Sequence, residues 1–359
     1  MRWYHKRGFT MNQQDSGRLR DLSPREARRR FLKRREQTQS PATVRSYGNR
    51  LNDFILWAEN ENIESMSELT GWEIDDYHMF REAQDIAPAT VRGTMVAVRQ
   101  LLLYCARVEV VDEDLPDKVD IPTLSKEQAS SSDRLETENA KALLNFYRDS
   151  TTYFGTAWHA FVEVAWHTGA RLGGIRALDM SDYDPEAQTL EFRHQPTVGT
   201  PLKNKEDGER VVGIGSSVVE ALEMYISRER DNKRDDYGRE PLFSCSQGRP
   251  SRSTFRGWCY LGTQPCIHQP CPHSAERHTC KLTERNHASK CPSSRSPHMI
   301  RTGSISWQLD RGVPIDLVAE RVNAAPDTIR RYYDKSTELE KFRERRQRIS
   351  TKLDIDNDE

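Results

Sequence analysis

The chain has 359 residues and an almost balanced charge, with 54 Lys and Arg against 55 Asp and Glu. This length allows two domains of ordinary size, and the net charge argues neither for nor against a polyanionic partner. No run approaches the roughly 20 apolar residues of a membrane span, no apolar segment follows the charged N-terminus as in a signal peptide, and seven cysteines, an odd number, argue against a disulfide framework. We therefore expect a soluble cytoplasmic protein with no membrane partner.

The charges are unevenly distributed along the chain. Residues 1–40 carry a dense run of arginine and lysine and are expected to form a basic N-terminal arm. Such an arm is the usual footprint of phosphate contact, because neutralising phosphates releases counterions, although a solvated helical face has the same composition. Residues 346–359 are expected to form an acidic C-terminal tail.

Residues 41–115 have the apolar periodicity of helices. Ser40 or Thr43 can cap the first of them, and two long runs repeat apolar residues at steps of three and four. We expect a small helical domain here. Residues 116–134 lose this periodicity and gain proline and serine, which predicts a linker between two domains.

Residues 135–345 are expected to form a second domain. Helical periodicity covers its start and residues 157–167, and two short strands are predicted over 189–193 and 210–214. The loop between the strands is rich in turn residues and indicates a hairpin, after which a helix resumes over 218–226. The expected fold class is mainly α with a small antiparallel β-sheet.

Arg171 follows a predicted helix end. Gly169 can adopt the left-handed conformation that ends helices, so Arg171 lies at a fixed point just beyond it. From there its guanidinium can hold two phosphate oxygens at once.

Two further residues that can carry positive charge, His298 and Arg301, lie at a predicted helix start. Ser296 can cap this helix, and Pro297 can occupy its first position. His298 then falls in the first turn, where the exposed amides and the helix dipole favour an anionic phosphate. Arg301 lies three residues later on the same face. The alternative for His298 is a zinc ligand or a core histidine, because cysteines lie nearby.

Two tyrosines follow near the end of the chain. Pro326 and Asp327 predict the start of a short helix that carries Tyr332 and Tyr333. These two lie about 100° apart on a helix, so only one of them can face the cationic residues. The chain thus offers two guanidiniums (Arg171 and Arg301), an imidazole (His298), a phenol and, in the predicted hairpin loop, the ammonium of Lys203. Together these groups suit attack by tyrosine on a DNA phosphodiester, and that reaction needs no metal.

Over residues 41–335, the order and spacing of these residues resemble the tyrosine recombinase, or phage integrase, family. The string Thr-Gly-Ala-Arg, which ends at Arg171, resembles the family's first box, and Ser-Pro-His-Met-Ile-Arg, which ends at Arg301, resembles its second. The opening of the family's core-binding domain is matched by Ser40, Thr43 and Tyr47.

The resemblance implies an architecture and an activity. Residues 41–115 would be a helical, SAM-like core-binding domain that binds DNA, and residues 135–345 an α+β catalytic domain. The protein would act on double-stranded DNA as a homo-tetramer, and it would break and rejoin strands through a covalent 3′-phosphotyrosine without a catalytic cofactor. The alternatives are a non-catalytic DNA-binding regulator on the same fold and a type IB topoisomerase.

The resemblance also assigns the remaining roles. The family keeps a lysine in the hairpin loop that protonates the departing 5′ oxygen, and Lys203 matches it, with Lys205 as the alternative. Tyr333 is the expected nucleophile, with Tyr332 as the alternative.

Two positions depart from the family's pattern. Asn323 stands where the family usually has histidine or tryptophan, and it can donate a hydrogen bond but cannot shuttle a proton. Gly173-Gly174 stands where the family usually has Ser-Glu after the first arginine. The full expected catalytic set is Arg171, Lys203, His298, Arg301, Asn323 and Tyr333.

Residues 259–291 form an insertion rich in cysteine and histidine. Thiolates and imidazoles at this density suit tetrahedral zinc, and a loop of this length needs a staple. A similar insertion occurs in integrase-like proteins of halophilic archaea, which implies an archaeal or viral origin. We expect a structural zinc ion held by Cys271, His273, Cys280 and Cys291, with His287 or Cys266 as substitutes.

Overall fold

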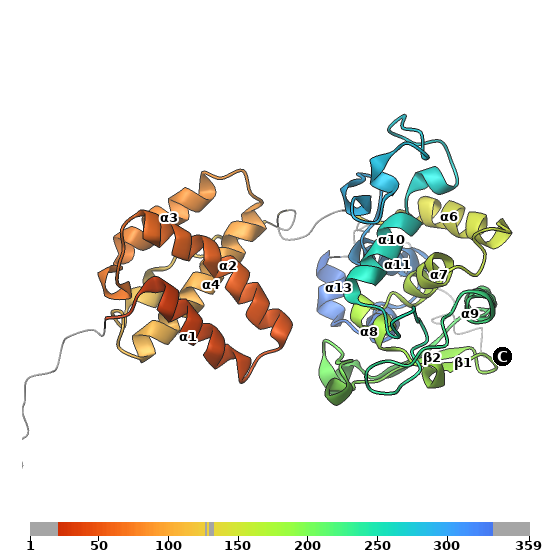
Figure 1. The fold of residues 1–359 in the computed structure, drawn as a ribbon, viewed down its shortest axis with the longest axis horizontal. Coiled ribbons are helices and arrows are strands. Elements are labelled where there is room, and N and C mark those ends of the chain that lie inside the picture. Colours follow the sequence, from red (N-terminus) through yellow and green to blue (C-terminus); the bar gives the residue numbers. More distant parts are fainter. Residues whose placement is uncertain (1–20, 126–127, 129–132, 333–359) are drawn as a thin grey trace, which may run out of the picture. The chain divides into compact units, whose positions relative to one another are not determined.

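The computed structural model describes residues 21–125, 128 and 133–332. They form two compact units, which divide between residues 131 and 132 (Figure 1). Each unit has a hydrophobic core of its own. Among the described residues, no helix is long and apolar enough to cross a membrane.

The first unit is a bundle of helices. Its second helix begins where the sequence predicts, because the side chain of Ser40 accepts a hydrogen bond from the backbone N–H of Thr43 and Pro41 follows at the first helical position. In the core, the rings of Phe54 and Tyr77 pack edge to face with centroids 5.0 Å apart. The helices are α1 (Pro24–Glu36), α2 (Pro41–Asn60), α3 (Gly71–Glu82) and α4 (Pro88–Arg107), with 3-10 turns at Met66–Glu68 and Leu115–Lys118.

Helix α1 differs from the expected basic arm. It packs against α2 and α4 and buries Phe31 in the core of the first unit. Part of its positive charge is engaged within the unit: Arg29 bonds Glu26 at 2.7 Å, and Arg35 donates to Gln100 at 2.6 Å. The sequence does not indicate this amphipathic helix clearly, because its buried apolar side chains are few and lie between arginines.

The second unit combines helices with a small sheet. The strands β1 (Tyr183–Asp184), β2 (Thr189–Phe192) and β3 (Arg210–Gly213) pair antiparallel in that order. This confirms the predicted fold class of mainly α with a small antiparallel β-sheet. The helices are α6 (Thr137–Asp149), α7 (Ala157–Thr168), α8 (Leu172–Ala177), α9 (Ser216–Arg228), α10 (Arg252–Gly262), α11 (Pro297–Asp310), α12 (Ile315–Val322) and α13 (Pro326–Tyr332).

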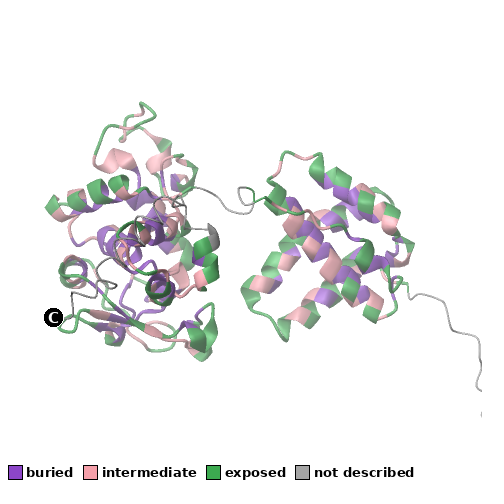
Figure 2. Cartoon of the chain, turned by 180° about the vertical axis from the view of Figure 1, so that it is seen from behind, coloured by how far each residue is buried: buried purple, intermediate pink, exposed green. Residues whose placement is uncertain are grey.

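Helix α7 forms the centre of the second unit. It packs against α9, α10 and α11, and most of its side chains are buried (Figure 2). The chain that precedes α6 lies directly on α11: the N–H of Leu135 donates to the carbonyl of Met299 at 3.1 Å. A Cβ on Gly303 would lie 2.0 Å from the carbonyl oxygen of Leu135, so this approach requires glycine.

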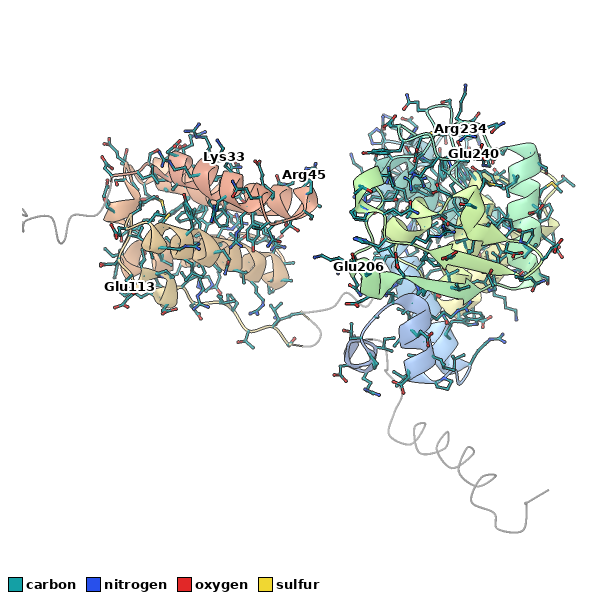
Figure 3. All side chains as sticks on the ribbon, turned by 90° about the horizontal axis from the view of Figure 1, so that it is seen from below. Lys33, Arg45, Glu113, Glu206, Arg234 and Glu240 are labelled. Atoms are coloured by element: carbon teal, nitrogen blue, oxygen red, sulfur yellow. The ribbon has the colours of Figure 1, made fainter. Side chains whose placement is uncertain are left out.

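Charged side chains of both signs cover each unit (Figure 3). Lys33 and Arg45 are exposed on α1 and α2, while Arg234 and Glu240 of the second unit pair at 2.5 Å. The mixture accounts for a formal net charge of only −1 on a chain that is 30% charged.

Candidate active site

The end of α7 presents Arg171. Gly169 ends this helix in the left-handed conformation, with φ 59°, and a Cβ there would lie 2.8 Å from a methyl carbon of Val322. Backbone and packing therefore both require glycine. Arg171 follows as the N-cap residue of α8. Its Nη1 donates to the carbonyl oxygen of Asn323 at 2.5 Å and to the side-chain oxygen of the same residue at 3.2 Å.

Arg301 comes from α11 and reaches the same place. Ser296 caps α11 and Pro297 occupies its first position, as predicted. The Arg301 side chain is buried, and its Nη1 donates to the carbonyl oxygens of Gly169 and Val322, both at 2.6 Å. Since the carbonyls of residues 322 and 323 are neighbours in the chain, the two guanidiniums converge on one point at the end of α12.

Asn323 joins three segments at that point. It ends α12 in the left-handed conformation, with φ 53°, which asparagine tolerates better than most residues. Its Nδ2 donates to the carbonyl of Asp207 at 2.9 Å, and its Oδ1 accepts from Asn204 at 2.5 Å as well as from Arg171. Asn323 therefore ties the β2–β3 loop to the first arginine.

Lys203 lies on the exposed loop between β2 and β3. The next residue, Asn204, makes the bond to Asn323. Lys205, the alternative, begins a 3-10 turn with a positive φ of 54°. The tie at Asn204 holds the backbone of Lys203 beside the end of α12.

His298 lies in the first turn of α11 and is exposed. Its pKa is lowered, first by desolvation and then by the positive charges of Arg301, Arg171 and Lys203. A neutral imidazole is the form that can accept a proton. Four of the expected catalytic residues thus share one electrostatic neighbourhood, although they come from three separate parts of the second unit: the start of α8, the β2–β3 loop and α11.

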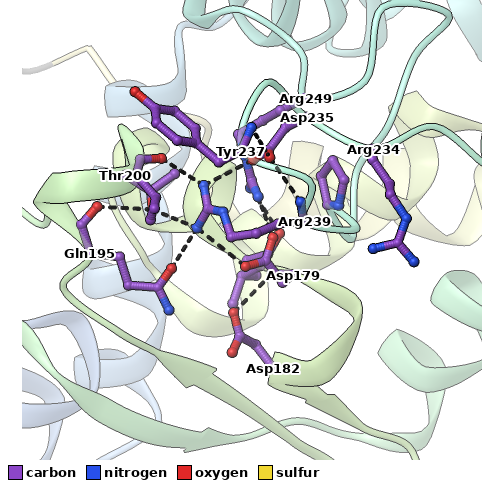
Figure 4. Close-up of polar contacts among 12 residues, drawn as sticks. Asp179, Asp182, Gln195, Thr200, Arg234, Asp235, Tyr237, Arg239 and Arg249 are labelled. Carbon is purple, nitrogen blue, oxygen red and sulfur yellow. Dashed lines mark hydrogen bonds and ion pairs between the residues drawn. The ribbon is translucent and has the colours of Figure 1, made fainter.

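A buried ion cluster holds the base of the β2–β3 loop (Figure 4). Arg239 bonds Asp179 at 3.3 Å and Asp235 at 2.9 Å, and Arg249 bonds both carboxylates as well. From this cluster, Arg239 also donates to Gln195 of the loop at 2.5 Å. We call these four charged residues the Asp179 cluster. Its position fixes one end of the segment that carries Lys203.

Arg210 is a third guanidinium at the site, and the sequence analysis missed it. Its guanidinium lies 4.2 Å from the ring centroid of Phe192, its cross-strand partner, and donates to the carbonyl of Arg321 at 2.8 Å. Burial, followed by the positive charges of Arg171 and Arg321, lowers its pKa to about 10.

Gly174, which departs from the family's Ser-Glu, packs against the ring of Phe192. A Cβ on this buried glycine would lie 3.2 Å from that ring, so the position has little room for a larger side chain.

The expected nucleophile lies outside the described residues. Helix α13 starts at Pro326, as predicted, and ends at Tyr332, the last residue that the structure describes. Tyr333 comes directly after it. The choice between the two tyrosines therefore stays a prediction.

The insertion between α10 and α11 surrounds a cavity of about 300 Å³. The four expected zinc ligands, Cys271, His273, Cys280 and Cys291, all line it, together with Cys266. The cysteines are free. Within the described ranges, however, no group of three or more His, Cys, Asp or Glu lies close enough to hold a metal ion, so this arrangement does not by itself support the expected zinc.

Two family models match the chain. The model described as "Phage integrase family" matches residues 133–339, and the model described as "Phage integrase, N-terminal SAM-like domain" matches residues 30–108. The first match covers more than half of the chain and includes every residue of the candidate active site.

Curated relatives agree with these models. The tyrosine recombinase XerD of Halalkalibacterium halodurans is 27% identical over 222 residues, which cover 61% of this chain and 70% of that protein. The tyrosine recombinase XerD of Mycobacterium tuberculosis is 23% identical over 303 residues, which cover 81% of this chain and 86% of that protein.

Among solved structures, the Tn1549 transposon integrase in complex with a circular intermediate DNA has a TM-score of 0.64 to this chain. It is 12% identical, and the match covers 89% of this chain and 98% of that one. At this identity the likeness concerns the fold alone.

Proposed function

The chain belongs to the phage integrase family, and from this membership we propose that it is a site-specific DNA recombinase that breaks and rejoins strands through a covalent 3′-phosphotyrosine. The observation that carries the proposal is the convergence of Arg171 and Arg301 on the neighbouring carbonyls of residues 322 and 323. Two guanidiniums fixed side by side can bind the non-bridging oxygens of one phosphate and stabilise the charge that develops on it in the transition state.

The reaction exchanges one phosphate ester for another. The phenolic oxygen of Tyr333 attacks phosphorus, the 3′ phosphate becomes linked to the tyrosine, and the 5′ oxygen leaves. His298 accepts the phenolic proton, and Lys203 supplies a proton to the departing oxygen. Because the new ester retains the energy of the old one, attack by a 5′ hydroxyl rejoins the strand without ATP. The chemistry requires no cofactor.

Asn323 acts in this scheme by position. An amide cannot exchange protons as the histidine of the family pattern does. The bonds of the Asn323 side chain to Arg171 and to Asn204 instead support a role in holding Arg171 and the β2–β3 loop, which carries Lys203, at a fixed separation. Such fixed geometry reduces the entropic part of the barrier.

We propose double-stranded DNA as the partner and a homo-tetramer as the active assembly. The match of residues 30–108 to the family's N-terminal SAM-like domain supports a DNA-binding role for the first unit. Exchange of strands between two duplexes requires four cleavages, one by each tyrosine of a tetramer. Sedimentation with and without a cognate duplex measures the assembly directly.

We also propose that the insertion holds a structural zinc ion with no part in the strand chemistry. Support comes from the thiol and imidazole side chains that line one cavity between α10 and α11. The metal content of the purified full chain tests this part of the proposal by itself.

A suicide substrate tests the nucleophile. Full-length protein is incubated with nicked duplexes selected for binding, and the covalent protein–DNA adduct is measured on a denaturing gel. We expect the adduct in the wild type and in Tyr332→Phe, and its loss in Tyr333→Phe. Loss in Tyr332→Phe alone would move the nucleophile by one residue.

Other outcomes would overturn the proposal. An adduct that survives both tyrosine variants rejects the mechanism. Specific binding without any adduct identifies a non-catalytic regulator, and relaxation of supercoils without sequence preference identifies a type IB topoisomerase.

A further inference from the structure

We infer that the insertion between α10 and α11 is a four-cysteine zinc site, with Cys266, Cys271, Cys280 and Cys291 as its ligands. The inference rests on the proposed zinc ion and is independent of the strand chemistry. It replaces the His273 of the sequence-based expectation by Cys266.

The four cysteines enclose one space from distant points of the insertion. All four line the cavity of about 300 Å³, all four are half-buried, and all four are free thiols. The other residues that line it are both apolar and polar, among them Leu282, Pro292 and Gln264. Thiolates that enclose one space are the usual ligands of structural zinc, which favours four-coordinate tetrahedral sites.

The histidines of the insertion are less suited to bind the metal. His273 is exposed at the edge of the cavity, and its Nε2 lies 2.9 Å from the hydroxyl of Ser293. The ring of His268 packs against Phe146 with centroids 5.9 Å apart, and His287 precedes the 3-10 turn Ala288–Lys290. Among the described histidines, only His273 lines the cavity.

The charges around the cavity suit four thiolates. A zinc ion with four thiolate ligands carries a net charge of 2−, and such sites are stabilised by donors to their sulfur atoms. Arg277 supplies one, since its Nη1 lies 3.0 Å from the sulfur of Cys266. Lys281 follows Cys280 in the sequence, and Lys290 precedes Cys291.

The insertion has little regular secondary structure. Between the end of α10 and the start of α11, the structure has only three 3-10 turns, at Pro265–Ile267, Lys281–Thr283 and Ala288–Lys290. Its base is closed by the bond from the N–H of Arg295 to Thr263, at 2.8 Å. A metal cross-link would therefore add rigidity to a segment that is otherwise held by short turns and single hydrogen bonds such as that from Gln264 to the carbonyl of Leu282.

Metal binding must draw the sulfur atoms inward. In the present arrangement the described residues include no group of three or more possible ligands close enough to share one ion. The four cysteines line one cavity of about 300 Å³, and we expect their side chains to turn into it when the metal binds. Cys291 lies just before Ser296, the N-cap of α11, so the closed site would fix the chain where it enters the helix that carries His298 and Arg301.

Metal analysis of the intact chain tests this ligand set. Full-length protein, loaded with zinc and dialysed, is measured for zinc per chain in the wild type and in Cys266→Ser, Cys271→Ser, Cys280→Ser and Cys291→Ser. Two control variants are His273→Ala, on the rim of the cavity, and Cys245→Ser, a free cysteine outside the insertion. We expect about one zinc in the wild type and in both controls, and at least a roughly tenfold weaker retention in each of the four cysteine variants.

A second measurement uses the wild type alone, so it does not depend on whether the cysteine variants fold. In the zinc-loaded wild type, the four thiols should resist a thiol reagent and should react after a strong chelator removes the metal. The wild type loaded with cobalt should show the charge-transfer absorption of thiolate ligands.

Three results would overturn the inference. The first is a wild type without zinc after loading, and the second is thiols that are paired as disulfides. The third is a His273→Ala variant that loses zinc as completely as Cys280→Ser while Cys266→Ser retains it, which would return the ligand set to the one expected from the sequence. A protein that binds zinc through the four cysteines and forms no DNA adduct would support this inference and reject the recombinase.

Discussion

Asn323 shows how much one residue at a helix end can organise. Its left-handed backbone turns the chain after α12, while its side chain bonds the β2–β3 loop and accepts from Arg171. The sequence identified it only as a substitution in the family pattern. Its role as a tie depends on where Asn204 and Asp207 lie, and the loop between two strands carries no signal for that.

A glycine variant separates the backbone role of Asn323 from its side-chain role. Asn323→Gly retains the left-handed conformation and the bond from Arg171 to the backbone carbonyl, but it removes the side-chain bonds to Arg171, Asn204 and Asp207. We expect the rate of covalent adduct formation to fall by about 10- to 100-fold, as a small misplacement of catalytic groups does. Asn62→Gly, at another left-handed asparagine in the first unit, is the matched control and should cleave at the wild-type rate. Full activity in Asn323→Gly would show that the tie is dispensable.

His298 gives a prediction for the pH dependence. Desolvation and three nearby cations lower its pKa below the usual 6.5, so the neutral, proton-accepting form persists as the pH falls through that value. The acid limb of the cleavage rate should therefore have its midpoint below pH 6.5, and His298→Gln should lose this limb together with most of the rate. A pH profile of single-turnover adduct formation measures both. A midpoint above 6.5 would contradict the role of the imidazole as base.

At the residue scale, the sequence correctly predicted helix ends that depend on one residue type. Gly169 ends α7 in the left-handed conformation, and Ser296 caps the start of α11, both as expected. Arg210 escaped notice since a single arginine at the start of a strand gives no periodic signal. Only the strand register places it over Phe192.

Among the elements, the β2–β3 loop depends on a cluster outside the catalytic set. The Asp179 cluster is well shielded, with Arg249 and Asp235 side chains only 4% and 6% exposed. Breaking one partner of such a cluster leaves uncompensated buried charge. We therefore expect the cluster to contribute both to the stability of the second unit and to the position of the loop that carries Lys203.

Arg239→Met tests this dependence. It should lower the free energy of unfolding by about 3–5 kcal/mol and slow adduct formation, because Gln195 loses its anchor. Arg234→Met is the control: its pair with Glu240 is exposed, with side chains 64% and 44% accessible, and should contribute only about 0–1 kcal/mol. Urea denaturation measures the stabilities. Equal effects of the two variants would contradict a structural role for the cluster.

The elements themselves were predictable where periodicity is long. The predicted strands 189–193 and 210–214 are found as β2 and β3, each one residue shorter. The strand β1 has only two residues, which is too short for an alternating pattern, and it was missed. Helix α1 was taken for part of an arm because arginines outnumber its apolar anchors.

At the scale of the whole molecule, the two hydrophobic cores are separate. We therefore expect two unfolding transitions. Leu51→Ala, at a fully buried position of the first core, should lower the stability of one transition by about 2–5 kcal/mol. Leu143→Ala should act similarly on the other. Differential scanning calorimetry of the full chain distinguishes these effects, and a single transition displaced by either variant would argue against independent units.

The start of the second unit has a consequence for how the catalytic groups are held. Arg134 and Leu135 come just after the division between the units, and both bond the segment that opens α11: Arg295 donates to the carbonyl of Arg134 at 3.1 Å, and Leu135 donates to Met299. The first described residues after the division are therefore bonded directly to the segment that opens the helix of His298 and Arg301. A displacement of Leu135 would reach these two side chains through α11, with no other element between them.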